Sequence, residues 1–318
     1  MTSAARRVSF TSDQSDLRPG PVVVGIGDRV REHDRSLLAA AEWAARRHLD
    51  VKLVMGLDSV DPFGDVGGTT DERRRRAMSE VDVAAQQFAM HVDLTQRVHA
   101  VVSRRPAEEA LIAESETAGL VVLQRRELRP VARLRAGSTT AVVAAQAHCP
   151  VLLVHADDTI HGTDTKRGVL VGVDDRGHAG RAIADAFDEA SWRGVALTAV
   201  LVWSPPVYSY VPPDDLELRE FQTGAAKTLA EQLAGHRDRY PDVEVHQVLH
   251  CGEPVPVLVD LARQHELLVV ARHSEGHHGK RNLGSVTGRV IEQASCPVLV
   301  TPTDRPEHTP RHRTGRRF

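Results

Sequence analysis

Short apolar runs alternate along this chain with longer segments in which apolar residues recur every three or four positions. The runs predict buried β-strands, and the longer segments predict amphipathic helices. In the first half the expected strands are 21–25, 51–55, 97–102, 120–123 and 151–154, and the expected helices are 36–47, 72–91, 106–117 and 138–147. In the second half the expected strands are 168–173, 196–202, 244–249, 267–271 and 298–301, and the expected helices are 179–192, 216–236, 254–264 and 285–293.

The regular alternation of strand and helix predicts right-handed crossover units, and therefore a parallel, doubly wound sheet in each half. In such sheets a ligand binds beyond the carboxyl ends of the strands, at the point where the strand order reverses. Candidate chemistry is therefore expected just after the first and fourth strands of each half.

Three landmarks recur at a constant offset of 147 residues, which indicates a tandem duplication. They are a glycine in the first strand, a Gly-Ser pair and a Cys-Pro-Val triplet. Their first residues are Gly25 and Gly172, Gly137 and Gly284, and Cys149 and Cys296. We expect one domain over residues 20–156 and a second of the same fold over 167–303, joined by a polar linker. Residues 1–19 and 304–318 are expected to be disordered.

Composition supports two ordinary domains. The chain has 318 residues, of which 41% are hydrophobic and only 4% aromatic, so the cores must be built from aliphatic side chains. A net charge of −3 gives no indication of a nucleic-acid or membrane partner. No apolar run approaches the roughly 18 residues of a membrane helix, and the N-terminus lacks the apolar core of a signal peptide. Three cysteines, an odd and sparse number, favour a reducing compartment, so we expect a cytoplasmic protein.

Polar residues follow the first and fourth strands of the second half. Asp174 ends the first strand, where its carboxylate can accept hydrogen bonds from a ribose or a base, or can cap the following turn. Position alone leaves these two roles equal. Gly284 and Ser285 begin a helix whose free backbone amides can bind phosphate, and the hydroxyls of Ser285 and Thr287 add donors. A solvated basic loop explains the preceding segment, 271–283, equally well.

The first half lacks several of these features. Gly27 stands at the position of Asp174, and Gln124 and Glu127 place long side chains after the fourth strand. Gly137 and Ser138 still begin the next helix. Because the long side chains would crowd a phosphate and the charge of Glu127 would repel it, this half is predicted to bind nucleotide weakly or not at all.

Two other kinds of site are disfavoured. His273, His277 and His278 have no clear carboxylate or cysteine partner, so exposed histidines are favoured over a metal site. Cys149 and Cys296 each precede a proline and the last strand of their half, where packing as small buried residues is favoured over a redox role. We expect no metal beyond one that arrives with a nucleotide.

These motifs resemble those of the universal stress protein family over nearly all of residues 20–303. The resemblance is carried by Val-Gly-Val-Asp ending at Asp174, Gly-x-Pro at Gly252, Gly-Ser at Gly284, and Cys-Pro-Val-Leu-Val from Cys296. It implies an α/β fold of two tandem, doubly wound, parallel five-stranded sheet domains, similar to adenine nucleotide alpha hydrolases. It also implies that the two domains pair through their last strands within one chain.

The ATP-binding members of that family carry Gly-x2-Gly-x9-Gly-Ser/Thr after the fourth strand and an Asp near the adenosine. Asp174, Gly284 and Ser285 match that pattern, whereas Ser274 replaces a motif glycine. The resemblance implies a non-catalytic stress-response module that responds to adenine nucleotides and binds ATP in its second domain. The residues expected to line the site are Val173, Asp174, Val202, Ala271, His273, Ser274, Gly284, Ser285, Val286 and Thr287.

Two alternatives stay open because both halves depart from the ATP-binding pattern. One is a scaffold of the same fold that no longer binds nucleotide, and the other is a weak ATP hydrolase. We expect no enzyme, since the sequence shows no combined set of nucleophile, base and metal ligands. Besides adenine nucleotide, the expected partners are unidentified regulatory proteins and a second copy of the chain.

Overall fold

A computed structural model describes residues 20–27, 34–57, 70–90, 97–125, 139–155, 167–204, 215–272 and 283–303. The expected disorder of the termini falls on residues outside these ranges. In the first half the elements are β1 (Val22–Gly25), α1 (Asp34–Arg47), β2 (Val51–Gly56), α2 (Thr70–Ala89), β3 (Val98–Ser103), α3 (Ala107–Glu114), β4 (Leu120–Arg125), α4 (Thr139–Gln146) and β5 (Val151–His155). In the second half they are β6 (Val169–Val173), α5 (Gly180–Arg193), β7 (Leu197–Trp203), α6 (Asp215–Arg239), β8 (Val245–Cys251), α7 (Pro254–Ala262), β9 (Leu267–Ala271), α8 (Ser285–Gln293) and β10 (Val298–Thr301).

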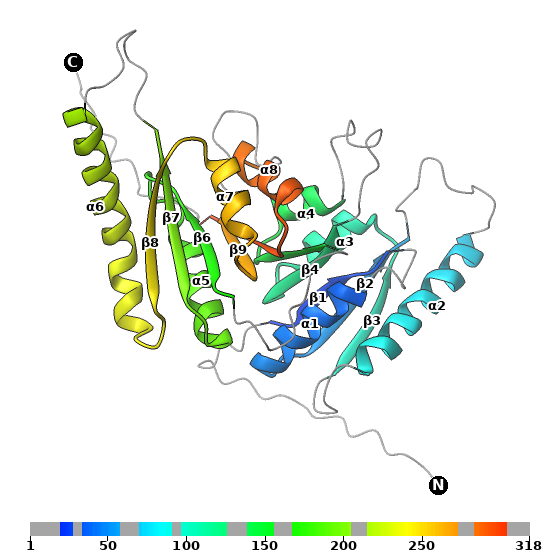
Figure 1. The fold of residues 1–318 in the computed structure, drawn as a ribbon. Helices are drawn as coiled ribbons and strands as arrows, with labels where there is room; N and C mark the ends of the chain where they lie inside the picture. The colour runs from blue at the N-terminus through cyan, green and yellow to red at the C-terminus, as the bar shows by residue number, and fades with distance from the viewer. Residues whose placement is uncertain are drawn as a thin grey trace, which may run out of the picture.

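All of these strands join one sheet in the order β3-β2-β1-β4-β5-β10-β9-β6-β7-β8 (Figure 1). Neighbouring strands within each half are parallel. The halves meet where β5 and β10 pair antiparallel, with Leu152 opposite Leu299. This confirms the predicted fold, two doubly wound five-stranded units paired through their last strands. The strand order reverses between β1 and β4 in the first half and between β6 and β9 in the second.

Helices cover both faces of the sheet and enclose two cores. One core lies under α1, α2, α5 and α6, and the other lies under α3, α4, α7 and α8. Successive strand residues point to opposite faces, so Val22 and Val24 join the first core while Val23 joins the second. Because both faces are covered, the inner strands are largely apolar, which is why they appear in the sequence as nearly continuous runs, whereas the edge strands β3 and β8 carry exposed polar residues.

The glycine landmark of the first strand in each half reflects close packing against a helix. A Cβ atom on Gly25 would lie 2.4 Å from Leu123 Cδ2 and 3.1 Å from Leu111 Cδ1, a side chain of α3. A Cβ atom on Gly172 would lie 3.3 Å from Leu258 Cδ2, a side chain of α7. Both halves therefore have glycine at the position where the first strand, β1 or β6, passes beneath the third helix, α3 or α7.

The cysteine landmark is a packing feature, as the sequence favoured. Cys149 and Cys296 are each 5% exposed and lie in the second core. Burial raises the pKa of the Cys149 thiol to about 12, which leaves it without a reactive thiolate at neutral pH.

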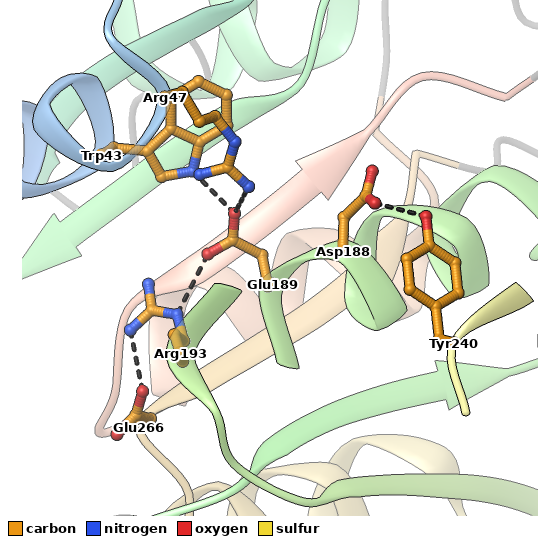
Figure 2. Close-up of polar contacts among 7 residues, drawn as sticks. All are labelled: Trp43, Arg47, Asp188, Glu189, Arg193, Tyr240 and Glu266. Carbon is orange, nitrogen blue, oxygen red and sulfur yellow. Dashed lines mark hydrogen bonds and ion pairs between the residues drawn. The ribbon is translucent and has the colours of Figure 1, made fainter. Parts of the chain in front are cut away.

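The halves also meet through α1 and α5, around the carboxylate of Glu189 (Figure 2). Glu189 Oε1 accepts hydrogen bonds from Trp43 Nε1 and Arg47 Nη2, each at 2.7 Å. Arg193 Nε donates to Glu189 Oε2 at 3.0 Å, and Arg193 Nη1 donates to Glu266 at 2.8 Å. Burial alone would raise the pKa of Glu189, but Arg193 and Arg47 outweigh it and lower that pKa.

Candidate functional site

The second half places several of the predicted residues around its switch point, where β6 and β9 end side by side. Val173 is buried at the end of β6, while Val202 and Ala271 are half-buried near the ends of β7 and β9. Asp174 follows β6, and Gly284 with Ser285 begins α8. His273 and Ser274 lie outside the described residues, so their part in the site stays a prediction.

Asp174 is held by the turn that follows it. One carboxylate oxygen, Oδ1, accepts the backbone N–H of His178 at 2.9 Å, and Oδ2 lies 3.2 Å from His178 Nδ1. Gln232 Nε2 on α6 donates to the main-chain oxygen of Asp174 at 2.8 Å. The turn-capping role is thus present, yet the side chain is still 32% exposed. Since a carboxylate has about four acceptor positions, Asp174 retains capacity for a ligand hydroxyl or amino group.

The amino end of α8 presents backbone amides without a side-chain cap. Gly284 is the N-cap residue, with φ −58° and ψ 151°, and among the described residues no side chain caps the helix. The first bond of the helix runs from the Gly288 N–H to the Gly284 carbonyl, at 2.9 Å. The amides of Ser285, Val286 and Thr287 precede that bond, which is the arrangement that binds anions at helix starts. The Ser285 side chain beside them is exposed.

Thr287 has a structural contact that its sequence position did not reveal. It is 4% exposed, and its hydroxyl donates to the carbonyl oxygen of Ala271 at 2.8 Å. Because a hydroxyl has only one proton, Thr287 ties α8 to the end of β9 and does not direct that proton at a ligand.

Two arginines near this edge were not among the predicted site residues. Arg272 follows β9, and Arg181 lies in the first turn of α5. Burial, and then the nearby Arg181 charge, lower the pKa of Arg272. Repulsion between the two guanidinium charges favours an anion beside them. The repeat could have drawn attention to Arg272, because an arginine, Arg125, also stands at the equivalent position of the first half. It gave no such indication for Arg181, since Asp34 occupies the equivalent position there.

In the first half the corresponding edge is described only in part. Gly27 stands where the second half has Asp174, so no carboxylate follows β1 at that position. Gln124 is half-buried and Arg125 is buried at the end of β4. Glu127, Gly137 and Ser138 lie outside the described residues, so weak nucleotide binding by this half stays a prediction.

Other features of the described residues lie away from the switch point. A cavity of about 190 Å³ opens at the amino ends of β6, β9 and β10, between Arg167, Arg263 and Ser295. It is thus at the opposite edge of the sheet from Asp174. Within the described ranges, no three His, Cys, Asp or Glu side chains gather as metal ligands. His277 and His278 are outside those ranges. Across the part of the chain that the structure describes, no helix combines the length and the apolar character needed to cross a membrane.

Comparison with known proteins decides the family. The model of the universal stress protein family matches residues 20–155 and again residues 166–302. The chain belongs to the universal stress protein family. Each of the two matches falls on one five-stranded unit, so this is a tandem universal stress protein, as the sequence motifs indicated.

Relatives with the same tandem length support that assignment. A universal stress protein of Mycolicibacterium smegmatis is 32% identical over 291 residues, covering 88% of this chain and 96% of the relative. The universal stress protein Rv2005c of Mycobacterium tuberculosis is 32% identical over 285 residues, with the same coverage, 88% and 96%. A crystal structure of a universal stress protein from Archaeoglobus fulgidus superposes with a TM-score of 0.63 at 16% identity, covering 91% of this chain and 99% of that one. The last comparison shows a shared universal stress protein fold.

Proposed function

We propose that this universal stress protein is a non-catalytic, cytoplasmic binding module that responds to adenine nucleotides and binds ATP in its second half. The observation that carries the proposal is the arrangement around one switch point. Asp174 offers a half-exposed acceptor at the end of β6, and α8 offers uncapped amides beside the end of β9. A carboxylate suits adenosine hydroxyls, and helix amides suit phosphates.

The surroundings of these two groups fit the same ligand. Val173 and Val202 bring apolar side chains to the strand ends, where an adenine ring can pack. Arg181 and Arg272 bring positive charge to the same edge of the sheet, where an anion is stabilised. We assign no catalytic step, because the polar groups described at this switch point are accounted for by binding and by holding the turn. ATP incubated with the protein is therefore expected to stay intact.

Calorimetry with ATP on the full chain tests the proposal. The wild type should bind one ATP, and Asp174→Ala should weaken binding about tenfold or more through loss of the adenosine acceptor. Ser285→Glu should also weaken ATP binding about tenfold or more, because a carboxylate at the start of α8 competes with phosphate for the backbone amides. The substitution should not destabilise the helix, since a negative charge at this end is favourable to the helix dipole. Asp175→Ala, an exposed neighbour, is the matched control and should leave the affinity unchanged. Equal affinities in all four proteins would remove the site, and no heat in the wild type would remove ATP binding.

A scaffold that binds no nucleotide is the second candidate, and one observation favours it. The Asp174 carboxylate already contacts the backbone and ring of His178, so the turn is satisfied without a ligand. This candidate predicts that freshly purified protein, once denatured, releases no adenine nucleotide detectable by mass spectrometry. Stoichiometric ATP in that supernatant would reject the scaffold and support the first proposal.

A further inference from the structure

Two arginines at equivalent places in the repeat reach across the boundary between the halves. Arg125 ends β4, and Arg272 stands 147 residues later, after β9. Arg125 Nη2 donates to the carbonyl oxygen of Ala294 at 2.9 Å, and Arg272 Nη1 donates to that of Ala147 at 2.6 Å. The two acceptors are also 147 residues apart. The contacts therefore form a reciprocal pair, which we call the arginine clasp.

One bond of the clasp starts at the second-half switch point, from Arg272, and the other lies at the far end of α8 from that switch point. Ala294 is the C-cap residue of α8, the helix whose other end presents the uncapped amides. Arg272 follows directly on β9, and its backbone N–H bonds to Thr301 of β10 at 2.8 Å. Both ends of the element that would hold phosphate are thus attached, directly or through β9, to residues of the first half.

These attachments are well placed to fix α8. Arg125 is only 7% exposed, so its guanidinium donates from a site where water competes little. A cation at the carbonyl end of a helix also complements the helix dipole. Thr287 ties the first turn of α8 to Ala271 at 2.8 Å, one residue before Arg272. The helix is therefore held at its first turn from its own half and at its last turn from the other half.

We propose that Arg125 and Arg272 are positioning residues for nucleotide in the second half, so that residues of the first half support a site in the other half. This rests on the proposed function. The helix is nine residues long and rigid, so a tilt at Ala294 also moves the amides at Ser285. Amides displaced by about 1 Å from a phosphate lose much of their hydrogen-bond energy.

The test compares ATP affinity and stability in full-length variants. Arg125→Gln and Arg272→Gln should each weaken ATP binding at least fivefold by calorimetry. Arg125→Lys, which keeps a charged donor, should recover part of that loss. Arg47→Gln is the matched control, because Arg47 also crosses the boundary, on the opposite face, to Glu189 at 2.7 Å. It should lower the melting temperature yet keep the ATP affinity within twofold of the wild type.

Hydrogen exchange adds a readout that does not depend on ATP. In Arg125→Gln the amides of α8 should exchange several-fold faster, whereas Arg47→Gln should leave them at the wild-type rate. Arg125 is the decisive position, since it belongs to the other half and its side chain is buried.

The outcomes separate the two proposals. Wild-type binding together with unchanged affinity in Arg125→Gln and Arg272→Gln overturns the positioning role alone. An equal loss of affinity in Arg47→Gln also overturns it, because any loosening of the boundary would then suffice. A wild type that binds no ATP overturns the proposed function and the positioning role together. If Arg125→Gln does not fold, Arg125→Lys decides: weaker ATP binding together with faster exchange of the α8 amides supports the positioning role, whereas wild-type affinity despite faster exchange overturns it.

Discussion

At the scale of single residues, Asp185 on α5 is a half-buried residue whose Oδ2 atom is buried without a partner among the described residues. Burial raises the pKa of Asp185 to about 7, with Asp188 and Glu189 adding to the rise while Arg181 and Arg47 oppose it. The folded protein therefore holds a proton on Asp185 that the unfolded chain releases near pH 4. Stability from this group is greatest at low pH and is lost as the pH rises from about 4 to about 7.

Asp185→Asn should remove that loss. We expect the variant to exceed the wild type in free energy of unfolding by on the order of 2 kcal/mol at pH 8, and by little or nothing at pH 4. Urea unfolding at several pH values measures the difference. Asp238→Asn, an exposed carboxylate on α6, serves as the control and should follow the wild type at every pH. A constant difference between Asp185→Asn and the wild type across this range would contradict the assignment.

The three cysteines differ in their surroundings, and this has a simple consequence. Cys149 and Cys296 are buried, whereas Cys251 at the end of β8 is exposed. Only a thiolate reacts quickly with a disulfide reagent, and burial raises the pKa of Cys149 to about 12. The native protein should therefore release one equivalent of chromophore from such a reagent quickly, and all three only in denaturant. Cys251→Ser should abolish the fast phase; a persistent fast phase would mean that a core cysteine is accessible.

At the scale of elements, Gly56 marks the point where β2 ends beneath α3. A Cβ atom there would lie 2.5 Å from both the Cα and the N of Ala107, so it would collide with backbone. Gly56→Ala should cost about 2 kcal/mol or more, because α3 must move away from the sheet. In contrast, Gly224 in α6 is exposed, and a Cβ atom added to it would meet nothing within 4 Å. Gly224→Ala should stabilise the protein by about 0.5–1 kcal/mol, and thermal unfolding of the two variants should move in opposite directions.

The elements were predictable because their signal is local. Strands covered on both faces appear as apolar runs, and β9, β10 and α8 have the predicted bounds. Helix ends were less predictable. The helix α3 was expected to reach residue 117 but ends at Glu114. There the amides of Glu116 and Thr117 bond to carbonyls three residues back, a tighter turn that continues the helical pattern. In α6 the last turn runs to Arg239, beyond the predicted residue 236.

The candidate site was predictable only where repeat and topology determine it. The places of Asp174 and Gly284 follow from the strand ends on which they stand. The contact of Asp174 with His178 and that of Thr287 with Ala271 depend on side-chain rotamers, which the sequence pattern does not encode. The bond from Arg272 to Ala147 depends on how the halves pair, so no pattern within one half could indicate it.

At the scale of the whole molecule, the two halves share a fold and the arginine clasp, but they do not share the contacts that Glu189 makes across the boundary. Glu42 and Glu189 are equivalent in the repeat, as are Arg46 and Arg193. Glu189 is buried beneath Trp43 and Arg47, whereas among the described residues Glu42 forms one exposed pair, with Arg46 at 3.9 Å. The reason lies in the partner helix. The second half has Ala190 and Gly194 where the first half has Trp43 and Arg47. Those two positions therefore supply no side-chain donors that could form an equivalent cluster around Glu42.

This asymmetry makes equivalent substitutions unequal. Glu189→Ala removes the acceptor of Trp43, Arg47 and Arg193 and leaves buried guanidinium charge uncompensated, so it should cost about 3–5 kcal/mol. Glu42→Ala breaks an exposed pair and should cost less than about 1 kcal/mol. Since Arg193 and Arg47 lower the pKa of Glu189, its contribution is present above the ordinary pKa of 4.5 and is lost as the pH falls below it. Chemical unfolding at pH 7 should separate the variants by at least about 2 kcal/mol; equal losses would mean that the boundary between the halves is held by β5 and β10 without the Glu189 contacts.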